Sequence, residues 1–217
     1  MFWDLLLAHF LGDFVLQTDW MVKHRDNLWV LSLHASIHFV LMFLLAGQAR
    51  SIIWPYLMLI AILHFIQDRV KNNITNKRKD WIEPGFILDQ ILHFVTIWAV
   101  VEWLQEVLGF TFPPQKPVGA IIGIAYLLVT YVWFIVERIF NFSNTEYLQN
   151  INNTKFSRMI SRGGLISVFL LVWQRAIAGL AFIFPNPYPQ SKFRKRAMLT
   201  DFSVSLFAMI FLFWALR

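Results

Sequence analysis

Apolar stretches long enough to cross a lipid bilayer recur along the whole chain of 217 residues. A helix needs about 20 consecutive apolar residues to cross a hydrocarbon core about 30 Å thick. The chain is 58% hydrophobic and 15% charged, which departs from the balance of a soluble globular protein. The sequence therefore predicts an all-α fold, a polytopic transmembrane helical bundle with six or seven spans.

The predicted spans are separated by polar segments and by segments rich in proline or glycine. We expect helices at roughly 2–23, 27–46, 52–74, 85–109, 117–140, 158–184 and 198–216. The Asn-rich stretch at roughly 141–154 is the longest predicted loop. Two domains follow from this pattern: a four-helix membrane domain with a polar core over residues 1–109, and C-terminal membrane helices with basic loops over residues 110–217.

The formal charge of +6 comes from lysines and arginines that cluster at the edges of the apolar segments. They do not form a stripe interleaved with aromatic residues, so we expect no nucleic-acid partner. Anionic lipid head groups are the expected partner, above all at the basic run of Lys192, Arg194, Lys195 and Arg196. A protein partner or a homo-oligomer stays open.

The chain has no cysteine, which excludes disulfides, thiolate catalysis and Cys-based zinc sites.

The distribution of basic residues predicts the orientation of the chain. With the N-terminus outside, the segments around Arg25 and Arg158 lie on the cytoplasmic side. The basic run at 192–196 then lies outside if there are seven simple spans. Either the sixth helix is re-entrant or interfacial, or the number of spans differs by one. We interpret Glu137 and Asp201 as charges at helix boundaries.

Each of the first four predicted helices carries a polar pair with the spacing i, i+4. The pairs are His9 with Asp13, His34 with His38, His64 with Asp68, and Asp89 with His93. Two residues four positions apart lie on one face of a helix, about 6 Å apart along its axis. A charged group in the middle of a bilayer costs about 2.5–3.5 kcal/mol, so these faces should turn away from lipid. We therefore expect the four helices to enclose a polar core.

Carboxylates and imidazoles on facing helices are typical ligands of a metal site inside a helical bundle. The expected ligands are the eight residues of the four pairs: His9, Asp13, His34, His38, His64, Asp68, Asp89 and His93. Nitrogen and oxygen ligands without sulfur suit zinc, manganese or iron, and this set is large enough for one or two divalent ions. The candidate catalytic residues are Asp13, Asp68 and Asp89. The candidate substrate-binding residues are Gln17, Gln90 and Lys71.

A divalent ion in this core would activate water for hydrolysis of a lipid-linked or other amphipathic substrate, so the leading hypothesis is an integral membrane metal-dependent hydrolase. The same residues also fit a proton or divalent-cation transporter or channel, in which polar groups are strung through the whole thickness of the bilayer. A third interpretation is a non-catalytic membrane subunit that binds a partner through its basic C-terminal half. Any single pair is also explained by an interhelical hydrogen bond worth about 1 kcal/mol.

Four segments, "HFLGDFVLQTDWMVKHR", "LHASIHF", "LHFIQDRVK" and "FILDQILHF", resemble a bacterial membrane family known as domain of unknown function 3307. The resemblance extends over residues 1 to about 105. It implies that the signature positions of the family are His9, Asp13, Gln17, His34, His38, His64, Asp68, Asp89, Gln90 and His93. It also implies a multi-pass protein of the bacterial inner membrane, and it specifies no reaction. A looser similarity to predicted membrane-bound metal-dependent hydrolases implies hydrolysis by analogy.

Overall fold

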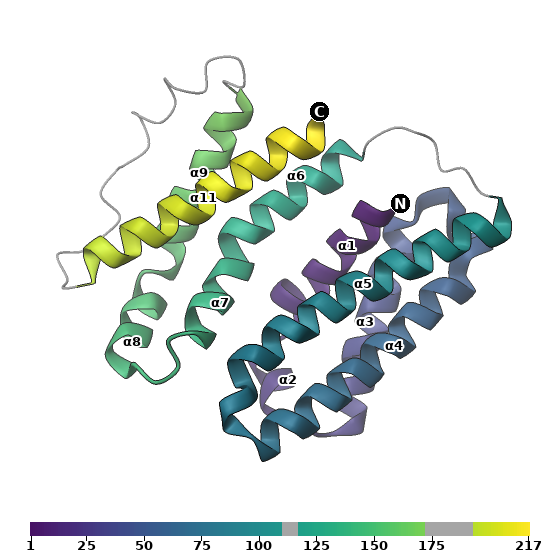
Figure 1. Ribbon diagram of the computed structural model, residues 1–217, viewed down its shortest axis with the longest axis horizontal. Coiled ribbons are helices and arrows are strands. Elements are labelled where there is room, and N and C mark those ends of the chain that lie inside the picture. The colour runs from purple at the N-terminus through teal and green to yellow at the C-terminus, as the bar shows by residue number, and fades with distance from the viewer. Residues whose placement is uncertain (110–116, 172–192) are drawn as a thin grey trace. The chain divides into compact units, whose positions relative to one another are not determined.

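The computed structural model describes residues 1–109, 117–171 and 193–217, and these residues are helical apart from short connections (Figure 1). No strand occurs in these three ranges. The chain forms two compact units, Met1–Ala120 and Ile121–Arg217, which are described separately below. The predicted all-α fold is therefore confirmed for the described residues.

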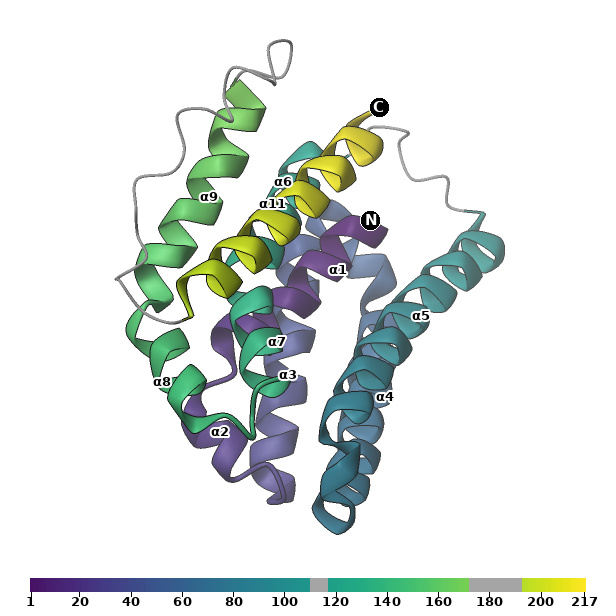
Figure 2. The same cartoon turned by 60° about the vertical axis from the view of Figure 1, so that its left-hand side comes forward.

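Three long helices and one broken helix build the first unit. In chain order its elements are α1 (Phe2–Phe10), η1 (Leu11–Leu16), α2 (Asp19–Lys23), α3 (Leu28–Leu45), η2 (Gly47–Ala49), α4 (Arg50–Lys77), η3 (Lys79–Trp81) and α5 (Ile82–Leu108). Helix α4 packs between α3 and α5, and α1 contacts both α3 and α5. Figure 2 shows α4 and α5 side by side, joined at one end by the tight turn that contains η3.

The prediction of one continuous helix over 2–23 is wrong, because the helix breaks before Thr18. Residues Leu11–Leu16 form a π-helix, and Gln17 then adopts an extended conformation with φ −72° and ψ 102°. The side chain of Thr18 accepts a hydrogen bond from the Met21 amide at 3.3 Å and caps α2. π-Helical turns occur frequently at functional sites, and this one contains Asp13.

The buried face of α4 changes character along the helix. It is apolar in the first half, with Ile53, Leu57, Ile60 and Ala61, and polar in the second half, with His64, Asp68, Asn72 and Thr75. Helix α5 runs in the opposite direction and shows the reverse order, with Asp89 and His93 followed by Ile97, Val100, Val101 and Leu104. The polar residues of the two helices therefore gather at the end near their connecting turn, and the other end is an apolar core.

From Val118 onward the helices are α6 (Val118–Leu127), η4 (Leu128–Val132), α7 (Trp133–Ile139), α8 (Thr145–Asn153), α9 (Lys155–Leu171) and α11 (Arg194–Leu216). Helices α9 and α11 pack against each other and against η4.

The prediction of a loop over 141–154 is wrong, since this segment contains α8. The side chain of Asn144 caps this helix by accepting a hydrogen bond from the Tyr147 amide at 2.9 Å. The part of the predicted helix 158–184 beyond Leu171 lies outside the described residues.

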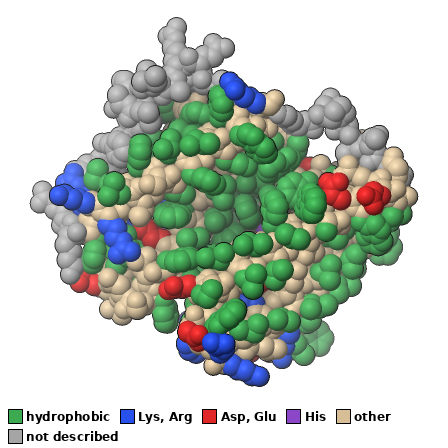
Figure 3. Space-filling view, in the orientation of Figure 1, with side chains coloured by type: hydrophobic (Ala, Val, Ile, Leu, Met, Phe, Trp, Pro, Cys, Tyr) green, Lys and Arg blue, Asp and Glu red, His purple; other side chains and the backbone are tan. Residues whose placement is uncertain are grey.

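Five helical segments in the described ranges are long and apolar enough to cross a membrane: Leu28–Leu45, Gly47–Lys77, Lys79–Val107, Val118–Ile139 and Arg194–Leu216. The predicted number was six or seven, and the first predicted span is interrupted by the break before Thr18. Large hydrophobic side chains such as Ile66, Ile91 and Trp98 are exposed along these segments. Figure 3 shows hydrophobic side chains over much of the visible surface. These features support association with a membrane.

Candidate metal centre

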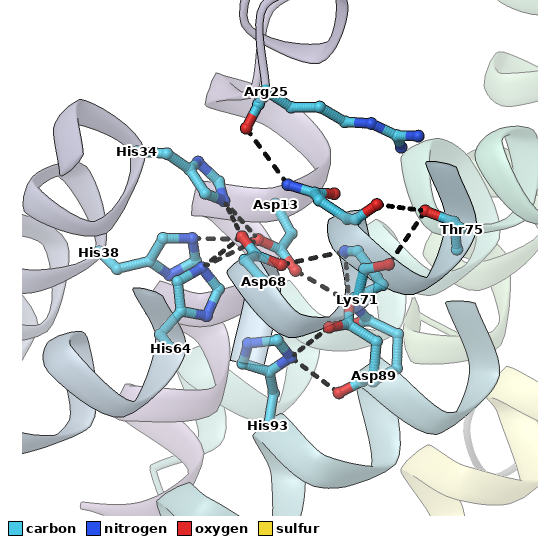
Figure 4. Close-up of polar contacts among 12 residues, drawn as sticks. Asp13, Arg25, His34, His38, His64, Asp68, Lys71, Thr75, Asp89 and His93 are labelled. Atoms are coloured by element: carbon cyan, nitrogen blue, oxygen red, sulfur yellow. Dashed lines mark hydrogen bonds and ion pairs between the residues drawn. The ribbon is translucent and has the colours of Figure 1, made fainter. Parts of the chain in front are cut away.

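Asp13 is the residue around which the polar core of the first unit is arranged (Figure 4). Nε2 of His34 and Nε2 of His38, both on α3, lie 3.1 and 3.0 Å from its Oδ1 atom. Its Oδ2 atom lies 3.6 Å from Nε2 of His9 and accepts a hydrogen bond of 3.1 Å from Nε2 of Gln90 on α5. Side chains from three separate helices thus meet at the carboxylate on the π-helix.

A second part of the core surrounds Asp68 and Asp89. Oδ2 of Asp68 lies 3.5 Å from Nε2 of both His34 and His64. The ammonium group of Lys71 donates to Oδ1 of Asp68 at 3.0 Å and to Oδ2 of Asp89 at 2.8 Å. The two aspartates are 3–4% exposed, so both carboxylates are removed from water and share one cation.

Five imidazole rings pack together beside these carboxylates. The shortest distances between ring centroids are 3.9 Å for His38 and His64 and 4.2 Å for His64 and His93. Rings of His9 and His93 stack at 4.9 Å. All five of these histidines are only 2–3% exposed. The four predicted polar pairs therefore lie at one place in the unit and form a single cluster.

His93 has a fixed orientation. Its Nδ1 atom donates a hydrogen bond of 2.7 Å to the backbone carbonyl of Asp89, because a carbonyl oxygen only accepts. In the neutral ring this arrangement leaves a lone pair on Nε2. Histidines that bind metals are commonly held in this way, with one ring nitrogen bonded to a carbonyl or carboxylate and the other free for the metal.

Several buried polar atoms of the cluster lack a hydrogen-bond partner. They are Nε2 of His9, His64 and His93, Nδ1 of His34, and Oδ1 of Asp89. Leaving a buried polar atom unsatisfied costs about 1–3 kcal/mol, so such atoms are rare without a functional reason. Imidazole nitrogens and carboxylate oxygens are metal ligands, and coordination would satisfy these atoms. The residues present therefore fit a bound divalent ion.

The ligand atoms form three overlapping groups, and within each group they all lie within 4.8 Å of one another. The groups are His9 with Asp13, His38 and His64; His34 with His64 and Asp68; and Asp68 with Asp89 and His93. His64 and Asp68 each belong to two groups. These groups could hold a metal ion, and they contain all eight of the predicted ligands.

A cavity of about 60 Å³ adjoins the cluster at His34, Asp68 and Lys71. Its wall has a polar part, with Gln17, Arg25 and Asn72, and an apolar part, with Met21, Val22, Val30 and Leu31. Of the three predicted substrate-binding residues, Gln17 and Lys71 line this cavity. Gln90 instead contacts Asp13 within the cluster.

Gly12 allows the ring of His38 to approach the π-helix. A Cβ atom at Gly12 would lie within 2.8 Å of three ring atoms of His38, a distance that real Cβ atoms essentially never show. Because the ring is enclosed by His34 and His64, it has little room to move away. Only glycine therefore fits at this position with His38 in place.

We predict that Gly12→Ala displaces His38, weakens metal binding and lowers the free energy of unfolding by about 1–3 kcal/mol. Gly119→Ala is the matched control, since a Cβ atom there meets no atom within 4 Å. This control should change stability by at most about 1 kcal/mol, in the stabilising direction expected for alanine in a helix. Zinc titration and thermal unfolding of both variants check the prediction; equal behaviour of the two would contradict it.

The second unit contains a buried ionic cluster that the sequence analysis missed. Arg158 donates to Asp201 at 2.6 and 2.8 Å and to Glu137 at 3.0 Å. Arg162 donates to the same aspartate at 2.6 Å, and the hydroxyl of Tyr147 donates to Glu137 at 2.6 Å. Burial and the bond to this glutamate raise the pKa of Tyr147. The two arginines therefore balance the charges of the two carboxylates within the cluster.

The predicted head-group contacts at 192–196 are only partly described. Lys192 lies outside the described residues. Arg196 donates a hydrogen bond of 2.6 Å to Asn141, and its guanidinium lies 4.4 Å from the ring centre of Tyr147. Lys195 is exposed and Arg194 is half-buried. Binding of lipid head groups by these residues stays a prediction.

Comparison with known proteins gives one result. Residues 1–118 match the model of a protein family, DUF3307, whose description is "Protein of unknown function". These residues make up more than half of the chain and contain every member of the His/Asp cluster. No curated protein and no solved structure matches the chain.

Proposed function

The chain belongs to the DUF3307 family, and we propose that it is an integral membrane metalloprotein that holds a divalent ion with His9, Asp13, His38 and His64. The observation that carries this proposal is the set of unsatisfied imidazole nitrogens. Nε2 of His9 and of His64 is buried without a hydrogen-bond partner, next to the carboxylate of Asp13. A purely structural polar core would be expected to satisfy these atoms internally.

We further propose that the protein is a metal-dependent hydrolase acting on a lipid-linked or other amphipathic substrate. The cavity beside the cluster supports this activity, because one part of its wall is polar and the other apolar. In this proposal Gln17 and Asn72, on the polar part of the wall, contact the polar head of the substrate, and Met21 and Leu31 contact its apolar part. A divalent ion, when bound, lowers the pKa of its water to about 7 and polarises a phosphoryl or acyl oxygen.

The aspartates have distinct roles in this proposal. Asp13 ligates the ion and positions His34 and His38, which both point at its Oδ1 atom. Asp68 faces both the imidazoles and the cavity, so it is the carboxylate best placed to accept a proton from a reacting water. Asp89 is held by Lys71 on the far side of Asp68 and acts electrostatically.

The distribution of polar groups favours an enclosed site over a transport path. A conduction path needs polar groups through the whole thickness of the bilayer. The buried faces of α4 and α5 are polar only near their connecting turn, and apolar residues such as Ile53, Leu57 and Val101 occupy the rest. The apolar half leaves no continuous row of polar side chains along these two helices.

We propose that the site is reached from the cytoplasmic side of the membrane. The polar halves of the buried faces of α4 and α5 lie toward the turn that joins these helices, where Lys77, Arg78 and Lys79 are exposed. Arg25 lies at the wall of the cavity, at the same end of the unit. Clusters of basic residues beside membrane spans are found mainly on the cytoplasmic side.

Hydrolase assays on purified protein in lipid nanodiscs test the activity. With zinc, manganese or iron added, we expect turnover of lipid phosphates or lipid esters, and a chelator should reduce it by about 100-fold or more. Asp68→Asn should reduce it at least as strongly. Glu106→Gln is the matched control, because Glu106 is an exposed carboxylate on the same unit. Metal-dependent flux of protons or divalent ions into liposomes, without hydrolysis, would instead support transport.

A further inference from the structure

We propose that the ammonium group of Lys71 occupies the second cation position of the cluster, so that the chain binds a single divalent ion. This inference rests on the proposed metal binding and specifies its stoichiometry. Asp68, Asp89 and His93 have the geometry of a metal site. In this proposal the ammonium group of Lys71 takes the place of the ion there.

The contacts of Lys71 carry the inference. Its Nζ atom lies 3.0 Å from Asp68 and 2.8 Å from Asp89, between two carboxylates whose side chains are 6% and 2% exposed. Oδ1 of Asp89 lies 3.7 Å from Nδ1 of His93, and one ligand atom each from Asp68, Asp89 and His93 lie within 4.8 Å of one another. An ammonium group therefore stands where a second ion would bind.

Charge balance gives the same answer. Asp13, Asp68 and Asp89 carry three negative charges, and Lys71 neutralises one of them. A single divalent ion neutralises the other two. Two divalent ions beside Lys71 would leave two positive charges in excess, and an excess of charge buried in a membrane protein is costly. The imidazoles supply ligand atoms without adding charge when they are neutral.

The two cation positions lie on opposite sides of the carboxylates. Figure 4 shows His38 and His64 on one side of Asp13 and Asp68, and Lys71 on the other. The ion pairs of Lys71 are with Asp68 and Asp89, whereas Asp68 also lies 3.5 Å from the ring nitrogen of His64 on the other side. Lys71 thus fills one position and leaves the other open for a metal.

Zinc counted per chain by mass spectrometry, on protein saturated with zinc and then passed through a desalting column, tests the inference. We expect one zinc in the wild-type protein and two in Lys71→Met, because removal of the ammonium frees Asp68, Asp89 and His93 for an ion. We expect one zinc in Asp89→Asn, since this residue belongs only to the position that Lys71 fills. Lys77→Met, which removes an exposed lysine of the same helix, should keep one zinc.

The remaining outcomes distinguish failure of this inference from failure of the proposed function. Two zinc ions in the wild-type protein, or one in folded Lys71→Met, would overturn the inference while leaving the proposed metal site intact. No zinc in the folded wild-type protein would overturn the proposed function itself. If Lys71→Met does not fold, Asp89→Asn decides the matter: one zinc supports the inference, and none shows that Asp89 is a ligand of the wild-type ion.

Discussion

Replacing Asp13 with asparagine is expected to abolish metal binding at the proposed site. Asparagine keeps the shape of the side chain but removes the negative charge and one of the two acceptor oxygens that His34, His38, His9 and Gln90 face. Loss of even an outer partner of a metal ligand typically costs about 10–100-fold in affinity, so loss of a ligand should reach the upper end or more. Zinc per chain should fall from one to background, as measured by mass spectrometry.

Asp80→Asn is the matched control for this variant. Asp80 is an exposed aspartate of the same unit, and its side chain pairs only at the surface with Arg78 at 3.2 Å. This variant should retain the zinc of the wild-type protein. Retention of zinc at wild-type affinity in a folded Asp13→Asn protein would show that Asp13 is not a ligand.

The largest expected effect on stability is that of Arg158→Met in the second unit. The guanidinium of Arg158, which is 2% exposed, pairs with Asp201 and Glu137, and both of these are also buried. Methionine fills much of the space but removes the cation that both buried carboxylates contact, while Arg162 stays paired with Asp201 and Tyr147 with Glu137. Breaking a buried ion pair in this way costs about 3–5 kcal/mol. Reversible unfolding in detergent micelles, followed by circular dichroism, measures the change.

Arg138→Met provides the comparison for this prediction. Arg138 is exposed, and its guanidinium lies 5.4 Å from the ring centre of Phe134. Loss of such an exposed contact should cost less than about 1 kcal/mol. A loss of stability in Arg158→Met no greater than that in Arg138→Met would mean that the ionic cluster contributes little to the fold.

The convergence of the four polar pairs could be predicted from sequence because it depends on local periodicity. An i, i+4 spacing places both side chains on one face of a helix, and the cost of exposing charge to lipid turns that face inward. His34 and His38, for example, point at the same oxygen of Asp13. The all-α fold was predicted from the long apolar stretches and the family from the resemblance of four segments, and both were confirmed.

The break in the first helix could not be predicted from the apolar pattern. The π-helix at Leu11–Leu16 changes the number of residues per turn without changing the composition of the segment. Gln17 therefore leaves the face that carries His9 and Asp13, and it lines the cavity instead. Thr18 followed by Asp19 does resemble the start of a helix, and this signal would have indicated the break.

The ionic cluster of the second unit was missed because its partners are far apart in the chain. Arg158 and Asp201 are separated by 43 positions, and each alone resembles a charge at a helix end. Helical periodicity gives the face on which a residue lies, but it does not give the helix that packs against that face. Lys71 was missed as the counter-ion of Asp89 for the same reason, because their contact spans 18 positions and two helices.

The metal content of the wild-type protein tests the central claim most directly. The protein would be purified in detergent, and its zinc, manganese and iron would be counted per chain by mass spectrometry before and after treatment with a chelator. We predict one tightly held divalent ion per chain, removed by the chelator and restored by adding metal back. A protein that is folded by circular dichroism and holds no metal under either condition would contradict the account.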